Sequence, residues 1–97
     1  MMSSGKDLVL MYRIEYSKRI SKQISKLDKN TQMNILKWIE KNLLGTDNPR
    51  LHGKPLVGNL NGMWRYRIGD YRLLAEIHDD ELLILAIEIG HRREIYR

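Results

Sequence analysis

The last nine residues of the chain, IGHRREIYR, bring together side chains that bind anions and transfer protons. They begin with Ile89 and Gly90, the end of an apolar segment, and the tail that follows contains one histidine, three arginines and one tyrosine. Histidine exchanges a proton near neutral pH, and a tyrosine ring can orient a substrate or stack against it. Chain termini usually carry little chemistry, so this composition indicates a functional tail.

A second group of arginines lies in the segment MWRYRIGDYRLLAEIH, residues 63–78. Side chains alternate along a strand, so Arg65 and Arg67 are expected on one face. If Gly69-Asp70 is a two-residue turn, Arg67 lies directly opposite Arg72, an arrangement that destabilises a hairpin in the absence of an anion. Arginine binds phosphate in a bidentate fork and keeps its charge, so the pattern favours an RNA or DNA backbone. The alternative is a solvated face on which acids such as Glu76 offset the arginines.

Metal chemistry and cysteine chemistry are disfavoured. His52, His78 and His91 show no metal-ligand spacing, HDDE at 78–81 fits a solvated turn, and the chain has no cysteine. The sequence also lacks a phosphate-binding glycine loop and a nucleophile elbow, and no cofactor is expected. What remains is metal-free cleavage of RNA, in which the substrate's own 2′-hydroxyl attacks the phosphate. This reaction needs a base, cations and an acid, which His, Arg and Tyr can supply.

The composition indicates one small domain. The chain has 97 residues and a formal net charge of +5, which favours nucleic acid or another acidic partner. The absence of cysteine is typical of a reducing cytoplasm, and no apolar run reaches the roughly twenty residues needed to span a membrane. We expect the domain to cover 11–97, and residues 1–10 to be an extension that is either disordered or a lead-in to the first strand.

The elements that must position these groups follow from hydrophobic periodicity and turn residues. Ser17 is a candidate N-cap of the first helix, and Gly45 is a candidate C-cap of the second. The predicted class is α+β, with the order β-α-α-β-β-β and a two-helix hairpin that covers one face of a small twisted antiparallel sheet. The predicted elements are a strand over 7–17, helices over 17–27 and 31–44, a loop over 45–62, and strands over 63–68, 71–78 and 81–90.

The last strand should pair with the preceding one and so lie close to the arginine hairpin. Its end is expected to deliver His91, Arg92 and Tyr96 to that sheet. Taken alone, His91 would be an ordinary surface histidine and Tyr96 a packing residue. The prediction of a site rests on the convergence of these side chains with Arg65, Arg67 and Arg72.

The stretch HGKPLVGNLNGMWRYRIGDYRLLAEIHDDELLILAIEIGHRREIYR resembles the RelE/ParE superfamily of bacterial toxins from type II toxin–antitoxin systems. The shared features are a GKPL loop, a strand with spaced basic residues, a Tyr-Arg-Leu on the next strand, and an HR ending followed by IYR. The resemblance covers nearly everything from Met11 to Arg97. It implies a RelE-like fold. Members of the RelE branch cleave messenger RNA, most of them in the ribosomal A site, whereas the ParE branch inhibits DNA gyrase and usually lacks the His-Arg pair and the terminal tyrosine.

The resemblance also implies roles for individual residues. Arg65 and Arg67 match a basic pair that is lysine in some members, and arginine cannot act as a base in the way lysine can. The base or acid is therefore expected at His91 or Tyr96. The full set of residues implied to be catalytic is Arg65, Arg67, Arg72, His91, Arg92 and Tyr96, and the expected RNA-binding residues are Lys54, Arg93 and Arg97.

The sequence therefore predicts the toxin of a type II toxin–antitoxin system, acting as a metal-independent endoribonuclease on messenger RNA at the ribosome. The expected partners are a cognate antitoxin, mRNA and the ribosomal A site, and the expected location is the cytoplasm. Two alternatives remain open: a ParE-like gyrase inhibitor, which would need neither His91 nor Tyr96, and a non-catalytic basic RNA-binding domain.

Overall fold

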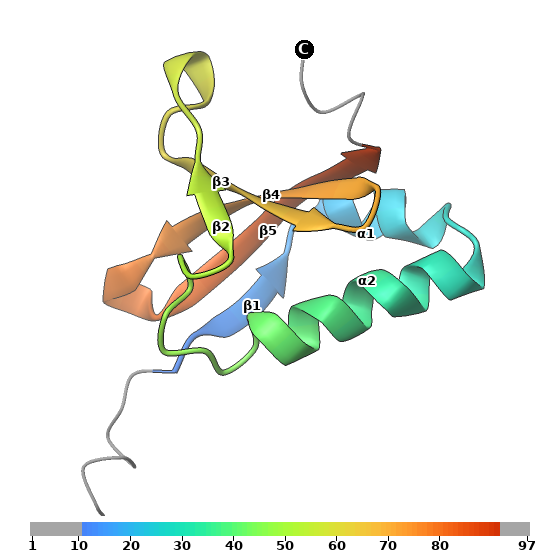
Figure 1. Cartoon of the computed structure of the whole chain (residues 1–97), viewed down its shortest axis with the longest axis horizontal. Helices are drawn as coiled ribbons and strands as arrows, with labels where there is room; N and C mark the ends of the chain where they lie inside the picture. The colour runs from blue at the N-terminus through green and yellow to red at the C-terminus, as the bar shows by residue number, and fades with distance from the viewer. Residues whose placement is uncertain (1–10, 92–97) are drawn as a thin grey trace, which may run out of the picture.

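A five-stranded mixed sheet forms the centre of the fold, and two helices cover one of its faces (Figure 1). The computed structural model describes residues 11–91. The α+β class and the helical hairpin are as predicted. The elements are β1 (Arg13–Tyr16), α1 (Lys18–Ser25), α2 (Lys29–Asn42), β2 (Gly53–Pro55), the 3₁₀ turn η2 (Gly58–Leu60), β3 (Met63–Ile68), β4 (Tyr71–His78), the 3₁₀ turn η3 (Asp79–Glu81) and β5 (Leu83–His91).

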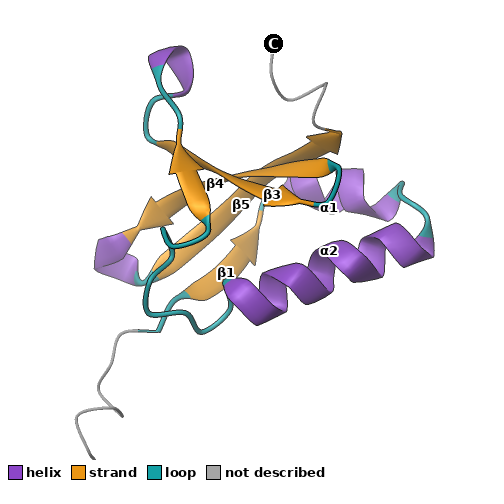
Figure 2. Cartoon of the chain, viewed as in Figure 1, coloured by secondary structure: helices purple, strands orange, loops and turns teal. Residues whose placement is uncertain are grey.

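The strands lie in the order β1-β5-β4-β3-β2, and Figure 2 shows β1 beside β5. The strands from β2 to β5 pair antiparallel, but β1 runs parallel to β5, with Ile14 opposite Ile84. The sheet is therefore mixed, and the expectation of an antiparallel sheet is wrong at this edge. The two helices between β1 and the meander carry the chain back along the sheet, which allows the parallel pairing.

Side-chain caps define the start of each helix. The Ser17 hydroxyl accepts a hydrogen bond from the Ile20 N–H at 3.0 Å, as predicted for α1. The Asp28 carboxylate accepts from the N–H and the hydroxyl of Thr31, so α2 starts at Lys29, two residues before its predicted start. An aspartate in a break between two helices is a strong capping signal, and here it outweighs the polar character of the first turn.

The segment 45–62, expected to be irregular, contains the short edge strand β2. Gly53 of β2 pairs with Tyr66 of β3, and a Cβ built on Gly53 would lie 2.8 Å from Cε1 of Tyr66. Only glycine allows the backbone to approach the ring this closely. Lys54 and Pro55 then pair with Arg65 and Trp64. A three-residue strand with a glycine and a proline gives no alternating pattern, which is why sequence periodicity misses it.

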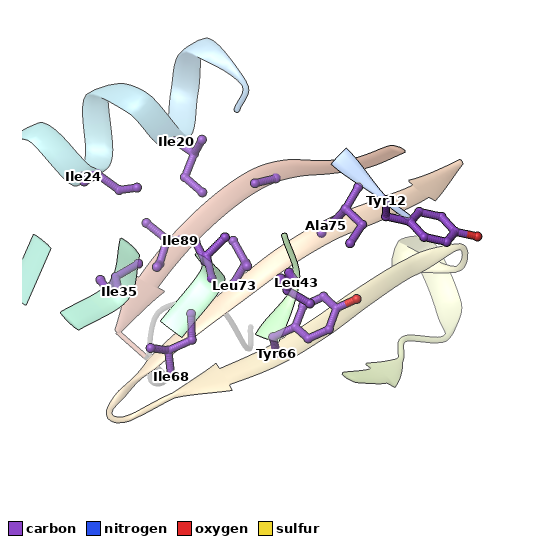
Figure 3. Close-up of a cluster of buried hydrophobic side chains, with 13 residues drawn as sticks. Tyr12, Ile20, Ile24, Ile35, Leu43, Tyr66, Ile68, Leu73, Ala75 and Ile89 are labelled. Atoms are coloured by element: carbon purple, nitrogen blue, oxygen red, sulfur yellow. The ribbon is translucent and has the colours of Figure 1, made fainter. Parts of the chain in front are cut away.

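The core lies between the two helices and the helix-covered face of the sheet (Figure 3). Tyr66 is fully buried there, and its hydroxyl donates a hydrogen bond to the Pro49 carbonyl. Burial raises the pKa of Tyr66 to about 12. The aliphatic part of the core comes from both layers: Ile20, Ile24, Ile35, Ile39 and Leu43 from the helical side, and Ile68, Leu73, Ile84 and Ile89 from the sheet.

A β-bulge in β5 changes which side chains face the core. Ala75 of β4 pairs with Ala86, whereas Leu74 pairs with Glu88, so Ile87 is the extra residue. Ala86 and Ile89 are both buried in the core, although three positions separate them. The bulge thus reverses the alternation, and it keeps the charged Glu88 out of the core.

Candidate functional site

The arginine hairpin forms as predicted on the sheet face that the helices leave uncovered. Arg67 lies opposite Arg72, and Ile68 lies opposite Tyr71. Gly69 has a φ of +61° at the first position of the two-residue turn, the geometry of a type II′ turn. Ile68 belongs to the core, so its neighbour Arg67 points to the uncovered face.

The members of this arginine group differ in exposure. Arg67 is exposed, Arg65 is half-buried, and Arg72 is buried, with 9% of its surface accessible. A long arginine side chain that is buried in a sheet face packs its aliphatic stem and holds its guanidinium in a limited range of positions. Arg72 is thus the most enclosed of the three arginines, and Arg67 is the most accessible to solvent and ligands.

Lys54 joins the arginines through β2. It lies opposite Arg65, and paired residues in neighbouring antiparallel strands project to the same face. Four cations from three adjacent strands therefore share the uncovered face. We call Lys54, Arg65, Arg67 and Arg72 the basic row.

The structure places His91 away from the basic row. His91 lies opposite Tyr71, and their ring centroids are 5.8 Å apart in an edge-on arrangement. Tyr71 lies opposite the core residue Ile68, so both rings project to the helix-covered side. The expectation that β5 brings His91 to the arginine face is therefore wrong. The bulge at Ile87 is the physical cause, because strict alternation from Ala86 would have turned His91 to the arginine face.

The remaining predicted site residues lie outside the described residues. These are Arg92 and Tyr96, expected to be catalytic, and Arg93 and Arg97, expected to bind RNA.

Acidic side chains on the uncovered face have partners of their own. Oε1 of Glu76 lies 2.9 Å from Nε2 of His78, two residues along β4. Glu88 forms an ion pair with Arg19 of α1 at 3.5 Å. Glu76, offered above as the acid that could offset the arginines, is thus engaged with a histidine nearer the other end of the strand.

Asp79 has a structural role that sequence reasoning missed. Its carboxylate accepts a hydrogen bond from the Tyr12 hydroxyl at 2.5 Å and a bidentate pair from Arg50 at 2.9 and 3.1 Å. These bonds, from Arg50 first and then from Tyr12, lower the pKa of the Asp79 carboxyl below its ordinary value. The Arg50 guanidinium also lies 5.4 Å from the Trp64 ring centroid. The segment HDDE is therefore more than a solvated turn, because Asp79 ties the start of β1 to the segment before β2.

The described part of the chain contains no group of three or more acidic, histidine or cysteine side chains that could hold a metal ion. Within residues 11–91, none of the helices has the length and apolar character needed to cross a membrane.

Comparison with known proteins identifies the family. A profile of the family described as "ParE toxin of type II toxin-antitoxin system, parDE" matches residues 6–96. The chain belongs to this family of type II toxin–antitoxin toxins, and the resemblance to the RelE/ParE superfamily is confirmed.

Individual relatives agree with this assignment. A stretch of 45 residues is 42% identical to Toxin RelG of Mycobacterium tuberculosis, and it covers 46% of this chain and 52% of RelG. The match thus spans about half the length of that curated relative.

Solved structures share the fold. The toxin–antitoxin complex RelBE2 of M. tuberculosis matches with a TM-score of 0.77 and 26% identity, over 84% of this chain and 99% of that chain. The isolated RelE toxin of E. coli matches with a TM-score of 0.67 and 22% identity, over 88% of this chain and 90% of that chain.

Proposed function

We propose that this toxin is an endoribonuclease of the RelE type, which cleaves messenger RNA without a metal ion. The basic row is the observation that carries the proposal. Four cations on the uncovered face of three adjacent strands, with Arg67 directly opposite Arg72, are suited to an extended polyanion. A phosphate bound between Arg67 and Arg72 can accept hydrogen bonds from both guanidinium groups.

The proposed reaction is attack of the substrate's 2′-hydroxyl on the neighbouring phosphorus. A new O–P bond forms, the bond to the 5′-oxygen breaks, and the products are a 2′,3′-cyclic phosphate and a free 5′-hydroxyl. Arg67 and Arg72 stabilise the charge that develops on the phosphate oxygens, and Lys54 and Arg65 hold the flanking backbone. Arginine stays protonated, so none of the three arginines in the basic row serves as the base.

Proton transfer requires a group on the same face as the scissile phosphate. His91 projects to the other side of the sheet, so we propose a binding role for it. The 2′-hydroxyl gives its proton to solvent water, and Tyr96 is the proposed acid that protonates the departing 5′-oxygen and then regains a proton from water. Arg92 is proposed as a further cation, and Arg93 and Arg97 as backbone contacts. Because the RelE branch acts on message in the ribosomal A site, we extend the proposal to the ribosome as the place of cleavage and to the cytoplasm as the compartment.

The test is mapping of new 5′ ends on message in a translation extract. The proposed chemistry leaves 5′-hydroxyl ends, which a kinase labels directly, whereas metal-dependent hydrolysis commonly leaves 5′-phosphates. Labelled ends that appear only with the active toxin, and that persist in excess chelator, support the proposal. Intact message in the presence of a folded toxin contradicts it.

Gyrase inhibition is the second candidate, because the matched profile is that of ParE and because His91 lies away from the basic row. A supercoiling assay with purified gyrase separates the two functions. Inhibition of supercoiling together with intact message would favour this second candidate.

We further propose that an acidic antitoxin neutralises the toxin. The net charge is +5, and similar chains have been solved as complexes described as RelBE and RelBE2. Complementary charge favours fast association. Co-expression of the neighbouring open reading frame tests this proposal: it should relieve growth arrest and co-purify with the toxin. If neither flanking gene does so, the partner assignment is wrong.

A further inference from the structure

A cavity of about 460 Å³ opens on the helix-covered side, where the end of β5 meets the C-terminal end of α1. We call it the Tyr71 cavity. Its walls come from Gln23, Lys26 and Leu27 on the helical side, and from Tyr71, Ile89, Gly90 and His91 on the strands. Its size is within the range of small-molecule sites. The proposed cleavage chemistry uses none of these side chains.

Two polar side chains of the Tyr71 cavity, Gln23 and Lys26, present hydrogen-bond donors. Oε1 of Gln23 accepts the Ile89 N–H at 2.8 Å, which fixes the orientation of the amide. The Nε2 group is left as a donor. Lys26 adds an ammonium group, and the described lining contains no carboxylate. Such a lining suits a ligand that carries acceptor atoms and negative charge.

Two aromatic rings complete the cavity. Tyr71 and His91 meet edge-on at 5.8 Å, and both line the space. The faces of aromatic rings in a partly open pocket offer a stacking surface for a planar group. A base offers both a planar ring and acceptor atoms on its edge, and the phosphate beside it can meet Lys26.

The Tyr71 cavity and the basic row lie back to back at the same end of the sheet. Tyr71 and Arg72 are consecutive, and their partners in β5 are His91 and Gly90. Consecutive residues of a strand face opposite sides of the sheet. Tyr71 therefore lines the cavity on one face, and Arg72 belongs to the basic row on the other face. Gly90 has no side chain to obstruct the rim between them. An RNA strand on the basic row can pass over this rim and turn a neighbouring nucleotide toward the cavity.

We propose that the Tyr71 cavity binds the base of a nucleotide that flanks the phosphate held by the basic row. This inference rests on the proposed RNA substrate and adds a subsite for base selection to it. Gln23 Nε2 donates to an acceptor on the base edge, and Lys26 binds the adjacent phosphate. Because Tyr71 and His91 meet edge-on, one of the two rings stacks on the base while the other contacts its edge. The Gln23 side-chain oxygen already accepts a hydrogen bond from the Ile89 N–H, so the side-chain NH₂ group is left to bind the base. Gln23 therefore selects a base that presents an acceptor at this position and not a donor.

The first experiment measures binding without cleavage. The four nucleoside 5′-monophosphates are titrated into the isotope-labelled full chain, and the side-chain amide of Gln23 and the backbone amides of Ile89 and Gly90 are followed by NMR. Saturable shifts at these groups, with affinities that differ among the bases, support the subsite. Shifts confined to the basic row, or no shifts at all, overturn it.

Two variants sharpen this test. Gln23→Glu keeps an acceptor for the Ile89 N–H but removes the amide donor and adds a negative charge, so affinity should fall about tenfold or more. Lys26→Met should weaken binding by a similar factor, whereas Lys18→Met removes the same charge at the other end of α1 and serves as the matched control. Equal affinity for Lys26→Met and Lys18→Met would contradict the role of the cavity.

The second experiment maps cleavage sites with Gln23→Glu. The base preference next to the cut should change in this variant relative to the parent protein. An unchanged preference overturns the subsite and leaves the nuclease assignment intact. If the parent protein does not cleave RNA, the proposed function fails, and the NMR titration still decides whether the cavity binds nucleotides.

Discussion

Arg67 of β3 lies directly opposite Arg72 of β4 on the sheet face that the helices leave uncovered. The two differ in surroundings, since Arg67 is exposed and Arg72 is buried. Two guanidinium groups in register on one sheet face can bind the same anion from two neighbouring strands.

Replacing Arg67 separates the effect on function from the effect on stability. Arg67→Ala should slow cleavage by about two to three orders of magnitude, because a cation that faces developing charge contributes roughly 2.7–4 kcal/mol. The melting temperature should hold or rise, since the repulsion from Arg72 is removed. Lys37→Ala, which removes one exposed charge from α2, is the control and should cleave normally. A fully active Arg67→Ala protein would exclude this residue from the site.

Gly53→Ala tests the close approach of β2 to β3. The added Cβ meets Tyr66 Cε1 at 2.8 Å and Trp64 Cε3 at 3.2 Å, and Tyr66 is held in the core. The strand must shift, which should cost about 1–3 kcal/mol in the free energy of unfolding. Denaturant titration measures that cost. If stability and RNA affinity are both unchanged, the placement of Lys54 does not depend on this contact.

Asp79→Asn tests the contacts from Tyr12 and Arg50. The pKa of the Asp79 carboxyl is lowered in the folded protein, so its stabilising contribution is present above the ordinary carboxyl pKa and is lost as the pH falls through the folded value. The variant should lose about 1 kcal/mol at neutral pH, and its stability should fall less steeply below about pH 4. Denaturant unfolding between neutral and acid pH gives both quantities. Asp80→Asn alters the adjacent exposed carboxyl and is the control. An equal effect of the two variants would argue against a stabilising role for the contacts of Asp79 with Tyr12 and Arg50.

Tyr66→Phe should change the response to alkali. Burial raises the pKa of Tyr66 to about 12, so the folded state favours the neutral phenol. The corresponding stability is present below the ordinary tyrosine pKa of about 10 and is lost as the pH rises toward the folded value. The variant should be about 1 kcal/mol less stable at pH 8, because the hydrogen bond to Pro49 is lost, and less sensitive to alkali. An identical alkaline decline in both proteins would contradict this assignment.

The arginine hairpin could be predicted because it depends only on residues that are close together in the sequence. Alternation fixes the faces of Arg65 and Arg67, and Gly69-Asp70 fixes the register with Arg72. The position of His91 was harder to predict because it depends on the bulge. A signal was present: strict alternation through Ile84 and Ala86 would have placed Glu88 in the core, and a buried unpaired carboxylate is costly.

Other parts of the site depend on contacts that a single sequence does not specify. Lys54 reaches the basic row only because Gly53 allows β2 to approach the ring of Tyr66. Asp79 finds partners 67 and 29 positions away along the chain. The position of β1 is not specified by a single sequence either. β1 pairs parallel with β5 at one edge of the sheet, and its residue pattern does not show at which edge of the sheet it lies.

The central claim is most directly tested by mapping 5′ ends on ribosome-bound message with the parent protein, Arg67→Ala and Tyr96→Phe side by side, and with purified gyrase assayed in parallel. We predict 5′-hydroxyl ends with the parent protein in the presence of chelator, a loss of two or more orders of magnitude in rate for Arg67→Ala, a clear loss for Tyr96→Phe, and normal gyrase supercoiling. Intact message together with inhibited gyrase would contradict the endoribonuclease assignment and favour a ParE-like inhibition of gyrase.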